Sequence, residues 1–337
     1  MQRFLPGENA PPPAAGIRGR KPQESLYPFP TNRRLPHTMD LSRPFPPNRL
    51  LAMLLLVALV PASLGYMYHE GNATTVTVLP VDGAPGRIVF IADPHLRDGN
   101  MAHIERTIGQ INALHPSVVL IGGDFTYRGA EDLPLNQVWS GIDAPVYAIL
   151  GNHDYLAGLG GPSIAKKMLL VQEADLNTAT YDVSGLDNGD VDPVFAGRVV
   201  EELEKAGVTV LRNEAVTLDI GGEPVMIVGL DDCWAGLTRP PEIPETDAFT
   251  LYLLHEPECR AAWDADLILA GHTHGGQFMP ANLHALDEVG VVELSGMKMR
   301  NGVPTYITQG IGTSNFNPQL RFSTSPEIVV IDPASGS

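Results

Sequence analysis

The sequence predicts an α/β protein in which two β-sheets pack face to face, with helices on the outside. From about Pro85 onward, short runs rich in Val, Ile and Leu alternate with polar and helical patterns. The first half of this region reads strand, helix, strand, helix, strand, which is typical of a parallel sheet. The second half holds several strands joined by short turns, one of them at Gly221-Gly222. Sheets built from such apolar runs need covering layers, so we expect one α/β domain over residues 75–333.

Two segments of this domain have helical spacing. In residues 101–114 the apolar side chains recur every three or four positions, on Ile104, Ile108, Ile111 and Leu114. Residues 194–207 predict a second helix, closed by a glycine. Residues 156–194 are rich in Gly, Asp and Asn, which predicts a long irregular insertion with one short helix near 164–171. The expected strands lie at 87–93, 117–124, 144–154, 208–213, 215–222, 223–232, 249–255, 265–272, 303–312 and 326–332.

Two further segments precede the domain. Residues 1–49 form a Pro-rich tail that we expect to be disordered, since 11 of the 30 prolines lie in residues 1–50. Residues 50–68 carry no charged side chain and read either as a transmembrane anchor or as the apolar core of a signal peptide. The small residues at Val60–Ala62 resemble a cleavage site, and initiation at Met39 would give a leader of normal length. Both interpretations stay open.

The charge distribution predicts orientation and partners. Arg33, Arg34, Arg43 and Arg49 precede the apolar segment, so the N-terminus should be cytoplasmic and the domain extracytoplasmic, either membrane-anchored or exported. Residues 1–70 have a net charge of +4 and the remainder −21. So acidic a domain disfavours nucleic acid as a partner and attracts divalent cations.

The two cysteines, Cys233 and Cys259, could pair in an exported protein or stay free. A CxxC motif is absent from the sequence, which excludes a thiolate zinc site.

Polar residues of the metal-ligand type follow the apolar runs, in "ADPH", "GGD", "GNHD", "LLHEP" and "GHTH". In α/β sheets such loops meet at the carboxyl ends of the strands. Carboxylate, amide and imidazole donors without sulfur suit Mn²⁺, Fe or Zn²⁺ better than Ca²⁺. Seven ligands are too many for one tetrahedral ion and fit two divalent ions that share a carboxylate, a pair able to bind and activate a phosphoryl group. The seven are Asp93, His95, Asp124, Asn152, His255, His272 and His274.

The ordered motifs "DPH", "GGD", "GNHD", "LLHEP" and "GHTHGGQ" over residues 93–277 resemble the calcineurin-like metallophosphoesterases. This resemblance implies a two-sheet α/β/β/α sandwich and a division of the ligands. The first metal takes Asp93, His95 and His274, the second takes Asn152, His255 and His272, and Asp124 bridges them.

The resemblance also implies roles for three residues that are not ligands. His153 would protonate the leaving group or stabilise the transition state, and Asp154 would orient it. Phosphoprotein phosphatases of this superfamily carry GDxxDRG, whereas "GDFTYRG" has Tyr127 in place of the second aspartate, which argues against a protein substrate. Arg128 remains, either as a phosphate contact or as an exposed loop arginine.

The implied function is hydrolysis of a phosphomonoester, phosphodiester or pyrophosphate by direct attack of water. The branch with GHTHGGQ resembles envelope-associated phosphoesterases, including the UDP-2,3-diacylglucosamine pyrophosphatase type, which points to a lipid-linked substrate. A cytoplasmic precursor of that kind would conflict with the topology argued above. Alternatives are a nucleotide phosphodiesterase or nucleotidase, and a catalytically silent metal-binding protein of the envelope. The oligomeric state stays open.

Overall fold

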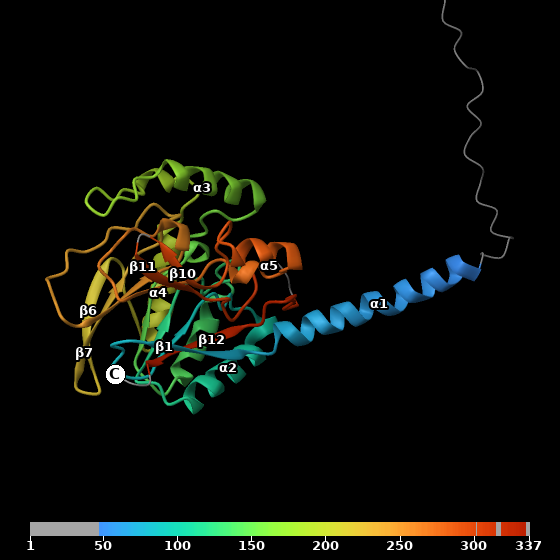
Figure 1. Cartoon of the computed structure of the whole chain (residues 1–337), viewed down its shortest axis with the longest axis horizontal. Coiled ribbons are helices and arrows are strands. Elements are labelled where there is room, and N and C mark those ends of the chain that lie inside the picture. Colours follow the sequence, from blue (N-terminus) through green and yellow to red (C-terminus); the bar gives the residue numbers. More distant parts are fainter. Residues whose placement is uncertain (1–46, 301, 315–317, 335–337) are drawn as a thin grey trace, which may run out of the picture. The chain divides into compact units, whose positions relative to one another are not determined.

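The computed structural model describes residues 47–300, 302–314 and 318–334. Nearly all of the Pro-rich tail expected at residues 1–49 lies outside the described residues. The chain divides into two units, Met1–Leu55 and Leu56–Ser337, and every described strand belongs to the second (Figure 1).

The apolar segment forms helix α1 (Pro47–Gly71). In the described part of the chain, α1 is the one helix long and apolar enough to cross a membrane. At about 1.5 Å per residue its length exceeds the hydrocarbon thickness of a bilayer, roughly 30 Å.

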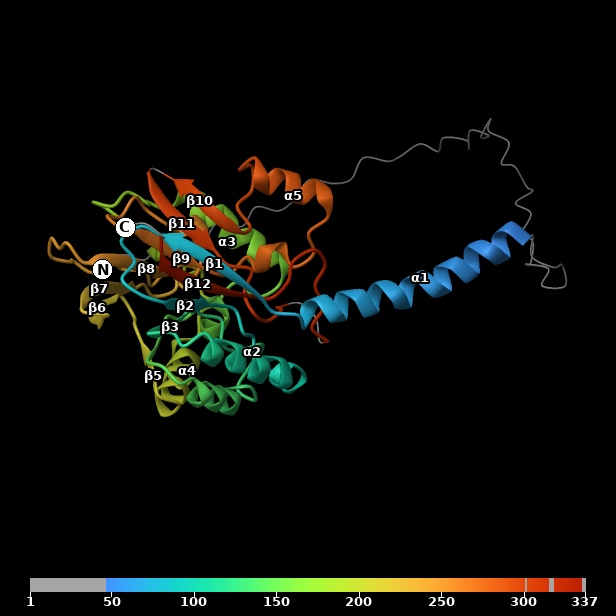
Figure 2. The ribbon, with the colours of Figure 1, turned by 60° about the horizontal axis from the view of Figure 1, so that its bottom comes forward.

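The first sheet confirms the parallel arrangement expected for the first half of the domain. Its order is β1-β12-β2-β3-β4-β5, and β2 to β5 are parallel. The end of the chain enters this sheet: β12 lies between β1 and β2, parallel to β1 and antiparallel to β2 (Figure 2). The strands are β1 (Thr75–Val81), β2 (Ile88–Ile91), β3 (Val118–Ile121), β4 (Val146–Ala148), β5 (Val208–Val210) and β12 (Glu327–Pro333).

The second sheet has the order β10-β11-β9-β8-β7-β6. The predicted hairpin at Gly221-Gly222 joins the antiparallel strands β6 and β7, and β10 pairs with β11 in the same way. The central pairs, from β7 through β8 and β9 to β11, are parallel. The strands are β6 (Glu214–Ile220), β7 (Glu223–Gly229), β8 (Phe249–Leu254), β9 (Leu267–Ala270), β10 (Gly296–Arg300) and β11 (Val303–Ile307).

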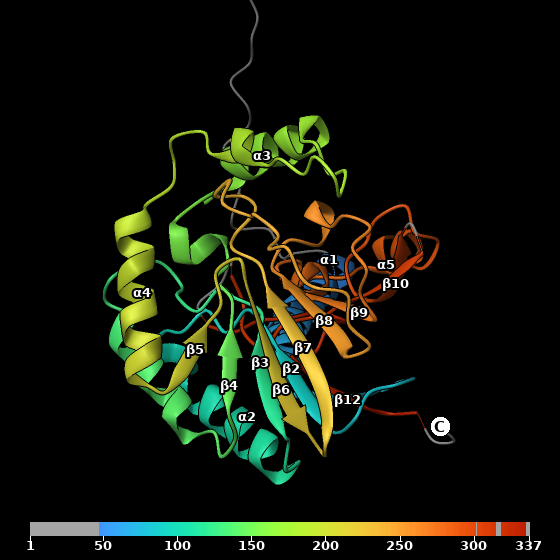
Figure 3. The same ribbon diagram turned by 90° about the vertical axis from the view of Figure 1, so that its left-hand side faces the viewer.

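Successive side chains of a strand point to opposite faces of its sheet, so each strand contributes to two packed layers. In β2, Ile88 and Phe90 pack between the two sheets, whereas Val89 and Ile91 pack toward the helices. The helices α2 (Met101–Ala113) and α4 (Pro193–Lys205) lie beside the first sheet (Figure 3). On the outer side of the second sheet, side chains of β7, β8 and β9 pack in a third cluster with α3 (Gly161–Glu173) and the tryptophans Trp234 and Trp263.

Two strands and one α-helix of the described residues were not expected from the sequence: β1, β10 and helix α5 (Ala281–Glu288). In addition, α3 is longer than the short helix expected near 164–171. The α2 prediction is confirmed, and its buried face includes Ile104, Ile108 and Ile111.

Candidate metal centre

The polar side chains singled out in the sequence come together at the carboxyl ends of five strands. Asp93 and His95 follow β2, Asp124 follows β3 and Asn152 follows β4 in the first sheet. His255 follows β8, and the loop that carries His272 and His274 follows β9 in the second sheet. The two sheets thus bring their loops to a common site, as the parallel strands required.

The first group of possible ligand atoms belongs to Asp93, His95 and His274, and these atoms lie within 4.8 Å of one another. Nε2 of His95 is 3.0 Å from Nε2 of His274. Two neutral imidazoles that face each other at this distance, beside a buried carboxylate, are a donor set that fits a divalent cation.

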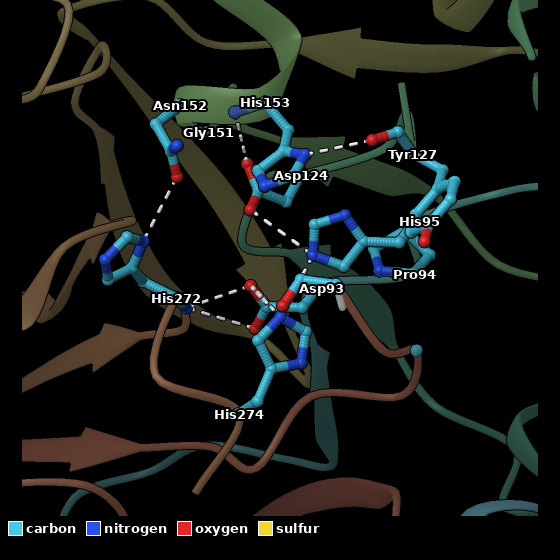
Figure 4. Close-up of polar contacts among 12 residues, drawn as sticks. Asp93, Pro94, His95, Asp124, Tyr127, Gly151, Asn152, His153, His272 and His274 are labelled. Carbon is cyan, nitrogen blue, oxygen red and sulfur yellow. Dashed lines mark hydrogen bonds and ion pairs between the residues drawn. The ribbon is translucent and has the colours of Figure 1, made fainter. Parts of the chain in front are cut away.

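The second group contains Asp124, His255 and His272. Nδ1 of His272 lies 3.1 Å from the side-chain oxygen of Asn152, which adds an amide donor to this group (Figure 4). Asp124 joins the two groups, because its Oδ2 is 3.4 Å from Nε2 of His95 and 3.2 Å from Nε2 of His255. Nε2 of His255 is buried and makes no hydrogen bond with the described residues.

Backbone carbonyls fix the tautomers of three histidines. Nδ1 of His95 contacts the Thr126 carbonyl at 3.2 Å, and Nδ1 of His255 contacts the Gly122 carbonyl at 2.6 Å. A carbonyl only accepts, so each Nδ1 carries a proton, and Nε2 is the nitrogen left to face a cation. His153 has the same arrangement with the Tyr127 carbonyl, at 3.1 Å.

The loops that carry these residues have unusual backbone geometry. Left-handed φ angles, which cost roughly 1–3 kcal/mol each for residues other than glycine, recur at the candidate ligands. Glycines allow the close approach of neighbouring loops: a Cβ on Gly151 would lie 2.3 Å from Asp124 Oδ1, and one on Gly271 would lie 2.8 Å from Asp93 Oδ2. The left-handed residues of the site are Asp93, His95, Asp124, His272 and His274, with φ of 56°, 42°, 60°, 70° and 53°.

Burial determines the charge of the site. It lowers the pKa of His95 and His274 well below the ordinary value and that of His272 to about 3, so these imidazoles stay neutral. Burial also raises the pKa of Asp93 to about 7, so this carboxyl is only partly ionised at neutral pH and a nearby positive charge would favour its ionised form. At His255, burial lowers the pKa, but the carboxylates of Asp124, Glu256 and Asp93 together raise it well above the ordinary value, so that a proton there balances the acidic side chains. A divalent cation would supply that positive charge instead.

His153 and Asp154 differ in what they contact. The His153 imidazole lies beside the first group, with its ring centroid 4.5 Å from that of His95, and one of its nitrogens lies within 4.8 Å of possible ligand atoms of His95 and Asp124. The Asp154 carboxylate accepts hydrogen bonds from the backbone N–H groups of Gly151, Asp124, Phe125 and Thr126 at 2.9–3.1 Å. Asp154 therefore ties the "GGD" and "GNHD" loops together, and it is the Tyr127 carbonyl that contacts the His153 ring.

Asp124, Asn152, His272 and His274 line a pocket of about 1210 Å³. Arg128 is exposed and lines this pocket, as does Arg300. Apolar side chains from two segments of the chain line the pocket. They are Leu159, Ile164 and Met168 on and before α3, and Val291, Val292 and Leu294 after α5.

Sequence reasoning missed the supporting residues of the site. Cys233 and Cys259, whose pairing stayed open, form a disulfide bond between the loops after β7 and β8. Next to it, the Trp234 ring packs against His272, with centroids 4.4 Å apart. The buried arginines Arg97 and Arg321 donate to the backbone carbonyls of His95 and His274. Tryptophan and arginine at such places carry no metal-ligand signal, so only their position in the fold reveals them.

A two-sheet α/β fold with a centre of this composition defines a metal-dependent hydrolase of phosphoric esters. The chain belongs to the calcineurin-like phosphoesterase family, whose family model matches residues 86–276. This confirms the resemblance seen in the ordered motifs.

Curated relatives agree with this assignment. The chain is 28% identical to phosphodiesterase YaeI of Escherichia coli (strain K12), covering 74% of this chain and 83% of that protein. It is 24% identical to the uncharacterized metallophosphoesterase YkoQ of Bacillus subtilis (strain 168), covering 83% and 97%. It is also 25% identical to a transmembrane protein with a metallophosphoesterase domain of Danio rerio, covering 70% and 52%.

Proposed function

We propose that this protein hydrolyses a lipid-linked phosphoester at a centre of two divalent ions. The proposal of two ions rests on the position of the Asp124 carboxylate, which lies between two groups of possible ligand atoms. Asp93, His95 and His274 would hold the first ion, and Asn152, His255 and His272 the second. Manganese, iron and zinc all suit this mixed oxygen and nitrogen donor set.

The bound ions would supply Lewis-acid chemistry, which polarises a phosphoryl group and activates water. Side chains of the protein would protonate the leaving group and contact the phosphate. His153 lines the pocket beside the first group and holds its Nδ1 proton against the Tyr127 carbonyl. When protonated, its Nε2 would donate to the departing oxygen of the ester. The guanidinium of Arg128, on the pocket wall, would contact a non-bridging phosphate oxygen.

The apolar walls of the pocket support a substrate with acyl or prenyl chains. Ile164 and Met168 on α3 line the pocket, as does Val291 after α5. Met168 is 46% exposed and Val291 is 66% exposed, although both are apolar. A hydrocarbon chain would bury these apolar side chains and gain about 25 cal/mol per Å² of apolar surface removed from water.

The test compares phosphodiesters that differ only in chain length, using the full chain in detergent with Mn²⁺. We expect kcat/KM to rise with chain length. The double variant Ile164→Asn, Met168→Asn should lose this gain through KM, while a short ester reacts as before. Leu169→Asn is the matched control, because Leu169 is on the same helix, is 63% exposed and does not line the pocket.

A flat response to chain length would contradict the lipid-linked substrate. In that case, faster hydrolysis of nucleoside phosphodiesters would favour the nucleotide phosphodiesterase alternative. Absence of hydrolysis for every ester, with metal bound, would favour the catalytically silent protein.

We also propose that the domain is anchored to or exported across a membrane and faces the extracytoplasmic side. The disulfide bond between Cys233 and Cys259 supports this, because such bonds persist in oxidising compartments. Helix α1 provides the candidate span. The named transmembrane relative is a further support.

A further inference from the structure

Arg321 connects the loop of His274, a candidate ligand of the first metal, to the loop that contains Gly310 and Gly312. Its side chain is fully buried, and Nη1 donates to the carbonyl of His274 at 3.3 Å. Nη2 donates to the carbonyls of Gly310, at 3.2 Å, and Gly312. The loop that contains these glycines in turn binds the backbone at Asp93, since the Gly312 N–H donates to the Asp93 carbonyl at 2.8 Å.

The backbone of His274 needs such support. Its φ of 53° is left-handed, and Gly275 and Gly276 after it also have positive φ. A loop in this conformation keeps its shape only when the surroundings hold it. The guanidinium is rigid and planar with several donors, so it can hold three carbonyls at fixed relative positions.

The segment that carries Arg321 is itself held by the last turn of α1. The Arg321 N–H donates to the Met67 carbonyl at 3.1 Å, and the Gln319 side-chain amide donates to the Gly71 carbonyl at 2.7 Å. The Glu70 carboxylate accepts from the Ser323 N–H at 3.0 Å. These contacts all lie within the unit Leu56–Ser337. The end of the apolar helix is therefore part of the domain that contains the metal centre.

We propose that Arg321 is a positioning residue for the ligand His274, and that the last turn of α1 keeps Arg321 in place. The affinity of the first metal site then depends on the junction between the apolar helix and the domain. Cleavage after Ala62 would leave this junction intact, because the contacts begin beyond that point. The inference rests on the proposed metal centre.

The first test replaces Arg321 in the full chain in detergent and measures bound Co²⁺, by elemental analysis and by the visible absorption of the ion, over a range of free Co²⁺. Arg321→Met should raise the free Co²⁺ that half-fills one of the two sites by about 10–100-fold, the usual effect of losing a residue that supports a ligand. Arg321→Lys keeps the positive charge but has one nitrogen in place of the two that reach the three carbonyls, so its effect should be intermediate. Arg87→Met, which removes an arginine paired with Asp332 elsewhere in the domain, should leave binding unchanged.

The direction of this effect separates positioning from simple electrostatics. Removing a buried positive charge should by itself strengthen the binding of a cation. Weaker Co²⁺ binding by Arg321→Met therefore supports positioning, whereas unchanged or tighter binding would overturn it. A wild-type chain that binds no Co²⁺ would instead refute the proposed metal centre, and this inference with it.

The second test places a methyl group at the junction and keeps Arg321. A Cβ on Gly71 would lie 2.5 Å from the Gln319 carbonyl oxygen, so Gly71→Ala must displace the segment. On Gly65, in the same helix, a Cβ meets nothing within 4 Å, and Gly65→Ala is the matched control. We expect Gly71→Ala to weaken Co²⁺ binding in the same direction as Arg321→Met, and Gly65→Ala to bind as wild type. Equal binding by the two alanine variants would overturn the role of the helix end.

Discussion

Asp124 is the residue on which the two-ion centre depends. Its Oδ2 lies 3.4 Å and 3.2 Å from the Nε2 atoms of His95 and His255, which belong to different groups. Asparagine keeps the shape but removes the charge that two cations would share. We therefore expect Asp124→Asn to lose both ions, as measured by elemental analysis after dialysis. Asp143→Asn, at an exposed position, should retain them. Full occupancy in Asp124→Asn would show that this carboxylate is not the bridge.

His153 should matter for proton transfer and not for metal binding. We expect His153→Ala to retain its ions and to lose roughly 10²–10⁴-fold in kcat, the usual contribution of a general acid. An alkyl ester should lose more than a nitrophenyl ester, because a good leaving group needs less help from a proton. His284→Ala provides the control, since His284 is on the exposed side of α5 and pairs with Glu288. Equal losses on both esters would contradict the general-acid role.

At the level of elements, the disulfide bond joins two loops that border the centre. Cys233 follows β7 and Cys259 follows His255, and the two cysteines are 26 positions apart in sequence. Both sulfurs are buried, and Trp234 beside them packs on His272. The bond therefore supports the wall of the site as well as the sheet.

Removing this bond should destabilise the domain. A closed loop of this length stabilises a fold by about 3 kcal/mol. The double variant Cys233→Ser, Cys259→Ser should thus unfold at a lower denaturant concentration, as followed by tryptophan fluorescence. Reductant should shift the wild type toward the variant and leave the variant unchanged. If the wild type and the double variant unfold at the same denaturant concentration, and reductant does not change that concentration for the wild type, the bond does not form in the protein.

At the level of the whole molecule, charge and redox chemistry both favour an extracytoplasmic domain. The arginines precede the apolar segment, and the next Lys or Arg after it is Arg87. The acidic residues of the domain contribute little to orientation. A site placed there would meet lipid phosphates and envelope precursors and few cytoplasmic nucleotides.

A reporter fused after Ser337 tests this orientation. Alkaline phosphatase should be active and green fluorescent protein dark, because the first requires export and the second fluoresces poorly after export in an unfolded state. The reverse pattern would place the domain in the cytoplasm. A cytoplasmic precursor of the UDP-2,3-diacylglucosamine type would then become the leading substrate.

The sequence by itself determined which residues could form the centre. Each of the motifs from "ADPH" to "GHTH" follows a buried apolar run, and parallel strands end at one edge of a sheet. The helix over 101–114 and the hairpin at Gly221-Gly222 were equally visible, because periodicity and turn residues are local signals.

Only the tertiary structure decided the rest, because it depends on contacts between distant segments. Strand β1 is largely exposed, and it pairs with β12, which lies about 250 residues later. The pairing of Cys233 with Cys259 required two loops of the second sheet to meet. Arg321 reads as an ordinary arginine until the fold places it between His274 and the end of α1. Local sequence patterns predict strands, helices and candidate metal ligands. The residues that hold those ligands in place come from distant parts of the chain and are recognised only in the folded structure.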